Sequence, residues 1–154
     1  MKEEERGPLD HRAMAVETFN RTWDYLDKDM RTAEENDMMV HTAHASRYHW
    51  SQVGTPLEFE RGDWQLSRVY ASLGKAAEAL HWAKHCLNTC LENEIAGFDL
   101  AFAFEAMSRA HAVAGNWKEA DMYLQNAKQA AKGIEKEEDR KYFVSQLDTI
   151  PRMP

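Results

Sequence analysis

The sequence predicts an all-α protein made of antiparallel helical hairpins, and three observations support this fold class. Apolar residues recur at three- and four-residue spacings, as Leu66, Val69, Tyr70 and Leu73 do, which places them on one face of a helix. The alternation that marks a half-buried β-strand is missing, and β-branched residues are scarce. Glycine and proline concentrate at breaks that divide the chain into pieces of about twenty residues.

Seven helices are expected between these breaks. The first follows Gly7-Pro8, and the second begins at Thr32-Ala33-Glu34-Glu35, which fits a capping box of threonine hydroxyl and glutamate carboxylate. The second helix ends at Gly54, because Pro56 cannot continue it. Single glycines separate the later helices, so the expected ranges are 10–29, 33–53, 57–73, 76–93, 98–114, 117–132 and 135–148. Gly62 is the exception, since it falls inside an expected helix.

Connections of about two to five residues force consecutive helices to lie antiparallel. We therefore expect one domain over residues 10–150, preceded by a flexible tail at 1–9. It comprises a degenerate hairpin at 10–54, hairpins at 57–93 and 98–132, and a capping helix at 135–148.

Composition limits the classes of function. The 154 residues carry a formal charge of −7, which argues against a nucleic-acid surface. No apolar run is long enough for a membrane span, and the charged first ten residues do not resemble an export signal. Cys86 and Cys90 lie four residues apart, a spacing that rarely permits a disulfide within one helix. We expect buried, reduced thiols in a cytoplasmic protein.

Two segments repeat at a shift of 41 residues. WQLSRVYASLGKAAEALHWAKHCL aligns with EAMSRAHAVAGNWKEADMYLQNAK, and six of the aligned pairs are identical. They include Ser67 with Ser108, Arg68 with Arg109 and Gly74 with Gly115. Each unit is a helix, a glycine turn and a second helix, and neither unit buries its apolar face alone.

These units resemble the tetratricopeptide repeat (TPR). Its pattern of large, small and aromatic residues, a turn glycine and then alanine is matched by Leu66, Ser67, Tyr70, Gly74 and Ala79. The resemblance covers about residues 60–132 and departs from the family in its 41-residue spacing and in lacking the closing proline. The string HTAHASRYHW is also similar to a small bacterial group with this architecture, which adds to the fold expectation only. The resemblance implies a right-handed array whose inner face binds peptides or helices.

One histidine-rich helix is a candidate metal site. Asp37, His41 and His44 share a helix face, and carboxylate and neutral imidazole are suitable ligands for zinc or iron. No further ligand is identifiable in the sequence. The alternatives are packing or hydrogen bonding by these side chains, and ligand binding.

In the repeat register, the first helix of each unit lines the inner face. We expect a binding groove that carries guanidinium groups for a carboxylate or acidic peptide and aromatic anchors. Its residues are Arg61, Trp64, Arg68, Phe102, Glu105 and Arg109, with Arg47 and Tyr48 as an extension from the second helix. The alternative is that Arg68 and Arg109 pair internally with acidic side chains.

We therefore expect a non-catalytic module that binds a protein or peptide and needs no cofactor. No nucleophile motif or phosphate loop indicates an enzyme. Self-association as a homodimer is a further expectation, with Trp117 or Met38-Met39 in the contact. The rival hypothesis is a metal-dependent enzyme or metal-binding protein that uses His41 and His44, and a third is a small-molecule sensor.

Overall fold

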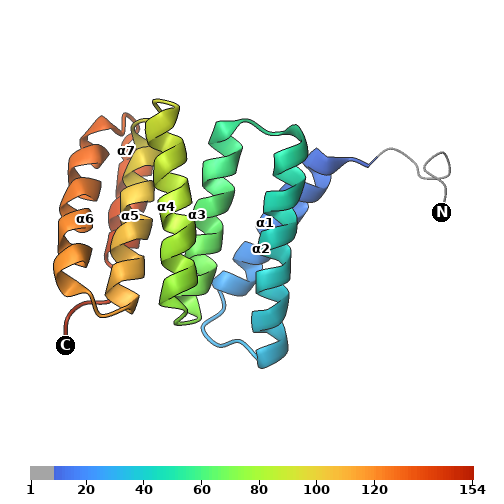
Figure 1. The fold of residues 1–154 in the computed structure, drawn as a ribbon, viewed down its shortest axis with the longest axis horizontal. Helices are drawn as coiled ribbons and strands as arrows, with labels where there is room; N and C mark the ends of the chain where they lie inside the picture. The colour runs from blue at the N-terminus through green and yellow to red at the C-terminus, as the bar shows by residue number, and fades with distance from the viewer. Residues whose placement is uncertain (1–8) are drawn as a thin grey trace.

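The computed structural model describes residues 9–154, and this part of the chain is helical without a strand. The second to the sixth helix lie side by side in chain order, and the seventh lies behind the fifth (Figure 1). The helices are α1 (His11–Leu26), α2 (Ala33–Val53), α3 (Pro56–Ser72), α4 (Ala76–Glu92), α5 (Phe98–Val113), α6 (Trp117–Ala130) and α7 (Glu137–Leu147). The predicted all-α class and the seven helices are confirmed. Residues 1–8 of the predicted tail lie outside the described residues.

The helices pack as three hairpins and one added helix. Consecutive pairs α1–α2, α3–α4 and α5–α6 form the hairpins, and α2–α3 and α4–α5 contacts join each hairpin to the next. Helix α3 also contacts α5 directly, so the first helices of the two repeat units are neighbours. Helix α7 packs against α5. The stack of hairpins predicted from the sequence is therefore present.

Local sequence signals explain where α2 begins and ends. Its capping box is formed, because Glu35 N donates to the Thr32 hydroxyl at 3.1 Å and Thr32 N donates to the Glu35 carboxylate at 3.0 Å. The helix ends at Val53, before Gly54, and Pro56 takes the first position of α3.

The turn glycines occupy equivalent corners of the two units. Gly74 has φ of +73° and Gly115 has φ of +78°, the left-handed region that a side chain disfavours. Backbone hydrogen bonds around the two turns also match, because Lys75 N donates to Tyr70 O and Asn116 N donates to His111 O, each at 2.9 Å. The 41-residue repeat is thus a structural repeat.

A pair of serines inside the hairpins also shows that the two repeat units are structurally equivalent. Ser67 Oγ donates to the carbonyl of Ala79 at 2.8 Å, and Ser108 Oγ donates to the carbonyl of Ala120 at 2.7 Å. Both serines are buried, so each joins the two helices of its hairpin by a shielded hydrogen bond.

Gly62 lies inside α3 because another side chain crosses it. A Cβ atom at this position would lie 2.8 Å from Cδ of Arg47 in α2. The Arg47 guanidinium continues past the glycine, donates to Asp63 at 2.8 Å and lies 4.8 Å from the Phe59 ring centroid. The glycine lets α2 and α3 approach with an arginine between them.

Helix α7 supplies a large buried side chain. Phe143 is fully buried and meets Phe102 of α5 edge to face, with ring centroids 5.0 Å apart. Across the described residues, no helix is both long enough and apolar enough for a bilayer span.

Candidate functional site

The six residues predicted for the groove lie together on α3 and α5. We call the side of these two helices that carries them the inner face. Helix α3 contributes Arg61, Trp64 and Arg68, and α5 contributes Phe102, Glu105 and Arg109. Residues of α1 and of α7 with its following turn border this face on opposite sides.

Glu105 is the centre of the inner face and is fully buried. Its carboxylate accepts from Trp64 Nε1 at 3.0 Å and from Arg109 Nε at 2.8 Å. Trp64 and Glu105 are equivalent positions 41 residues apart, so this bond joins the two repeat units directly. A second guanidinium, Arg68, brings Nη1 to 3.5 Å from the same carboxylate.

Arg109 is satisfied within the chain. Besides Glu105, it donates to the carbonyls of Gln146 and Thr149 and to the Thr149 hydroxyl, at 3.1, 3.2 and 2.7 Å. Gln146 lies in the last turn of α7 and Thr149 follows this helix, so Arg109 connects the end of α7 and the turn after it to α5. Arg109 therefore shows the internal pairing that the sequence left open as an alternative.

Arg68 is less completely paired. Its Nη2 donates to the Gln146 side chain at 3.1 Å and to the Thr149 hydroxyl at 3.5 Å, both uncharged. Its Nη1 is buried without a hydrogen-bond partner, because the contact with Glu105 lacks hydrogen-bond geometry. Burial lowers the pKa of Arg68, Glu105 opposes this shift and Arg109 adds to it. Two guanidiniums thus share one buried carboxylate.

Two hollows open on the inner face. The arginine hollow, of about 630 Å³, is lined by Arg68 and Arg109, by residues at the end of α1, and by Tyr142, Gln146 and Thr149. The aromatic hollow has a volume of about 460 Å³. Six aromatic side chains line it: Phe19 and Trp23 of α1, and Trp64, Phe98, Phe102 and Tyr142. Four ionisable residues complete the lining: Glu60, Arg61, Asp99 and Asp139. Trp23 and Tyr142 border both hollows, so the two are neighbours.

The aromatic hollow has a rigid wall. The Trp23 and Trp64 rings stack with centroids 5.7 Å apart, and Phe102 meets Trp64 edge to face at 5.5 Å. At its edge, Arg61 forms a two-point ion pair with Asp99, at 2.8 and 3.0 Å. Burial alone would raise the pKa of Asp99, but the hydrogen bonds to Arg61 and Glu60 and the charge of Arg61 together lower it.

A larger hollow of about 990 Å³ lies between α6, α7 and the C-terminal residues. Its lining combines aliphatic and aromatic side chains with charged ones, such as Lys132 and Arg152. It shares Pro151 with the arginine hollow, but Arg68, Glu105 and Arg109 do not line it, which is why we place the candidate site at the two smaller hollows.

The structure separates the proposed extension residues from the groove. Arg47 lies between α2 and α3 on Asp63. Tyr48 is exposed and faces His11 and His49. Neither residue lines either hollow.

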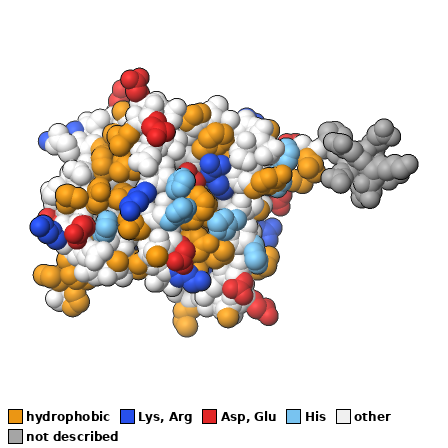
Figure 2. All heavy atoms as spheres, in the orientation of Figure 1, with side chains coloured by type: hydrophobic (Ala, Val, Ile, Leu, Met, Phe, Trp, Pro, Cys, Tyr) orange, Lys and Arg blue, Asp and Glu red, His pale blue; other side chains and the backbone are white. Residues whose placement is uncertain are grey.

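The residues of the predicted histidine metal face do not converge. Asp37 and His41 are exposed, whereas His44 Nε2 is bound to the Tyr70 hydroxyl at 2.8 Å. Burial lowers the pKa of His44, and nearby His41 adds to this shift. Figure 2 shows histidine side chains spread over one face of the molecule, with apolar side chains among them.

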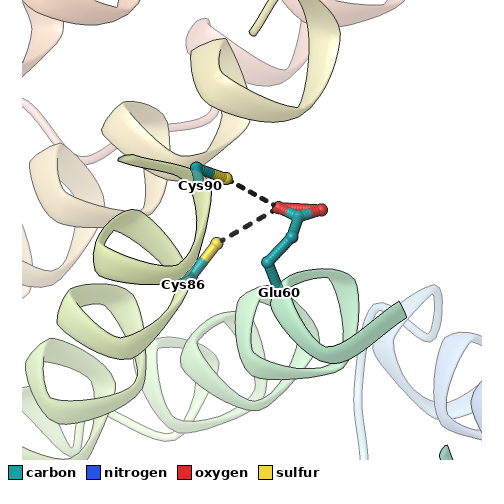
Figure 3. Close-up of side chains that lie close together, drawn as sticks. All are labelled: Glu60, Cys86 and Cys90. Atoms are coloured by element: carbon teal, nitrogen blue, oxygen red, sulfur yellow. Dashed lines mark hydrogen bonds between the residues drawn. The ribbon is translucent and has the colours of Figure 1, made fainter. Parts of the chain in front are cut away.

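A different group of metal-ligating side chains meets between α3 and α4 (Figure 3). Cys90 Sγ and Cys86 Sγ point at Glu60 Oε2, at 3.1 and 3.7 Å. In residues 9–154, this is the one group of three such residues whose ligand atoms all lie within 4.8 Å of one another. All three side chains are buried, and both cysteines are free thiols, as predicted.

Burial also raises the pKa values of two members of this group. It raises the pKa of Glu60 to about 11, and Asp99 and Cys90 add to the shift. Hydrogen bonding to Cys90 and burial hold the pKa of Cys86 above its usual value. The carboxyl is therefore protonated at neutral pH, and it hydrogen-bonds to the neighbouring Asp99 carboxylate.

Sequence reasoning missed this cluster and the contributions of α1 and α7. Glu60 is 26 residues from Cys86, and no spacing rule joins them. The repeat alignment held a signal, however. A shift of 41 residues places Glu60, Cys86 and Cys90 over Ala101, Ala127 and Ala131, so three polar or reactive side chains replace alanines.

Comparison of the chain with known protein families, curated proteins and solved structures finds no match. The geometry of the inner face is therefore the basis for interpreting the site.

Proposed function

We propose that the chain is a TPR-like, non-catalytic binding module that holds a carboxylate-bearing protein or peptide on its inner face. The observation that carries this proposal is that two guanidiniums beneath the arginine hollow share one buried carboxylate. Arg68 and Arg109 share Glu105 as an ion-pair partner, and the hydrogen-bond partners of Arg68 are the neutral side chains of Gln146 and Thr149.

A carboxylate is the group that best completes this arrangement. Charge-assisted hydrogen bonds are about twice as strong as neutral ones, so a ligand carboxylate competes well with Gln146 for Arg68. Asp27 also lines the hollow, but no ion pair joins it to Arg68. The volume of about 630 Å³ lies within the usual range for ligand pockets.

The aromatic hollow provides the second part of the surface. Its tryptophan and phenylalanine rings are packed on one another before any partner binds, which lowers the entropy lost on binding. A peptide that reaches from one hollow to the other therefore places an acidic group at Arg68 and an apolar side chain beside Trp64.

The test is fluorescence polarisation with labelled hexaglutamate, hexaserine and hexalysine peptides. We expect hexaglutamate to bind best and the Arg68→Gln variant to bind it about tenfold more weakly or worse, since a hydrogen bond to a charged group contributes about 1.5–3 kcal/mol. The matched control is Arg21→Gln, which removes an exposed arginine of α1. Equal affinity for the three peptides, or unchanged binding by Arg68→Gln, would refute the proposal.

A further inference from the structure

We propose that Glu60, Cys86 and Cys90 form a zinc-binding site between α3 and α4. The site is separate from the arginine hollow and does not depend on peptide binding there. Thiolate and carboxylate are both zinc ligands, and two thiolates favour zinc over magnesium or calcium.

The ligand geometry is close to that of a zinc site. A tetrahedral ion with bonds of about 2.3 Å to sulfur and about 2.0–2.2 Å to oxygen spaces its ligand atoms roughly 3.6–3.8 Å apart. The two sulfur-to-oxygen distances are 3.1 and 3.7 Å, and both thiols point at the same Glu60 oxygen (Figure 3). The i, i+4 spacing of the cysteines on α4 holds both thiols toward α3.

Comparison of the two repeat units argues that packing alone does not require these residues. The second unit fills the equivalent positions with Ala101, Ala127 and Ala131, and the first two of these are fully buried. The same helix–helix contact is therefore made with methyl groups. A buried carboxyl costs more than the methyl group that fills the equivalent position of the second unit, which indicates that Glu60 serves another purpose.

The surroundings of the cluster supply access and charge. Glu60 and Asp99 both line the aromatic hollow, which gives an ion a route from solvent. A water from the hollow or the Asp99 carboxylate completes four ligands. Binding requires deprotonated thiols, and Zn²⁺ held by two thiolates, the Glu60 carboxylate and a water carries a net charge of −1, or −2 with Asp99 in place of the water. Arg61, whose Nε lies 3.9 Å from Glu60 Oε1, stands beside that charge.

The first experiment is a titration of the reduced full-length chain with Co²⁺ under anaerobic conditions. We expect one Co²⁺ per chain, thiolate-to-cobalt charge-transfer absorption, and its loss when one equivalent of Zn²⁺ is added. His41→Ala, which removes an exposed imidazole of α2, is the control for binding at surface histidines and should leave the titration unchanged.

The variants use the residues of the second unit. The triple variant Glu60→Ala, Cys86→Ala, Cys90→Ala should keep its helical circular dichroism and cooperative melting but lose the cobalt absorption. Glu60→Gln, an isostere of the protonated acid, should fold as the wild type does and bind at least about tenfold more weakly, because even outer-shell partners contribute about 10- to 100-fold.

Three results would overturn the proposal. They are a reduced wild-type chain that takes up neither Co²⁺ nor Zn²⁺, bound Co²⁺ without thiolate absorption, and unchanged affinity in Glu60→Gln. If the triple variant does not fold, Glu60→Gln decides the question. The peptide assay with Arg68→Gln is independent, so failure of one proposal leaves the other standing.

Discussion

Replacing Glu105 by glutamine tests the buried charge network of the inner face. Glu105 is fully buried and is the only carboxylate within 4 Å of both Arg68 and Arg109 in the described chain. The glutamine side chain still accepts from Trp64 Nε1, but its NH₂ group faces guanidinium donors and two positive charges lose their counter-charge. Removing one partner of a buried ion pair costs about 3–5 kcal/mol. We expect about 3 kcal/mol, because the tryptophan bond survives.

The assay is urea unfolding followed by tryptophan fluorescence, with thermal melting as a second measure. For a chain of this size, about 3 kcal/mol corresponds to a melting temperature lower by roughly 6–12 °C. Glu17→Gln is the matched control, since Glu17 is exposed on α1 and its replacement should stay within about 0.5 kcal/mol. A loss below about 1 kcal/mol in Glu105→Gln would mean that water solvates the guanidiniums and that the network is not buried as described.

Three other predictions concern the fold. Gly74→Ala and Gly115→Ala should each lose about 1–2 kcal/mol in urea unfolding and agree within about 0.5 kcal/mol, because both have positive φ and open space for a Cβ; very unequal losses would contradict the equivalence of the two corners. Phe143→Ala should lose about 3–5 kcal/mol, and a loss near zero would show that α7 does not dock on α5. Stability should fall as the pH drops through about 6.5, because burial lowers the pKa of His44 and the unfolded chain then binds a proton that the folded chain resists. His44→Gln, which still has a partner for the Tyr70 hydroxyl, should reduce this fall between about pH 7.5 and about pH 5.5, and an unchanged profile would assign the effect to other groups.

The helices and the glycine turns were predictable because each depends on residues that are close together in the sequence. The capping box at Thr32, the proline at position 56 and the left-handed turns at Gly74 and Gly115 depend on residues close together in the chain. The register of the repeat then placed Arg68 and Arg109 on one face. Periodicity of apolar residues is sufficient for these features, since each helix buries one stripe.

The partners of those arginines were not predictable in the same way. The turn after α7 folds back so that Thr149 binds Arg109, and this contact depends on how α7 packs on α5. The meeting of Glu60 with the two cysteines likewise depends on the packing of α3 against α4. Gly62 was an unexplained exception until the path of Arg47 across it was visible. Each of these features arises from tertiary contacts between residues that are distant in sequence.

Side-chain NMR of ¹⁵N-labelled arginine tests the claim that Arg68 is the guanidinium available for a ligand carboxylate. Hexaglutamate is titrated into the protein while the Nε–Hε signals of Arg68 and Arg109 are followed. The arrangement of partners predicts a large, saturable shift at Arg68 and a small one at Arg109, whose donors are already bound to Glu105, Gln146 and Thr149. The claim would be contradicted if the Arg68 signal did not shift, or if the signals of exposed arginines shifted as much as that of Arg68.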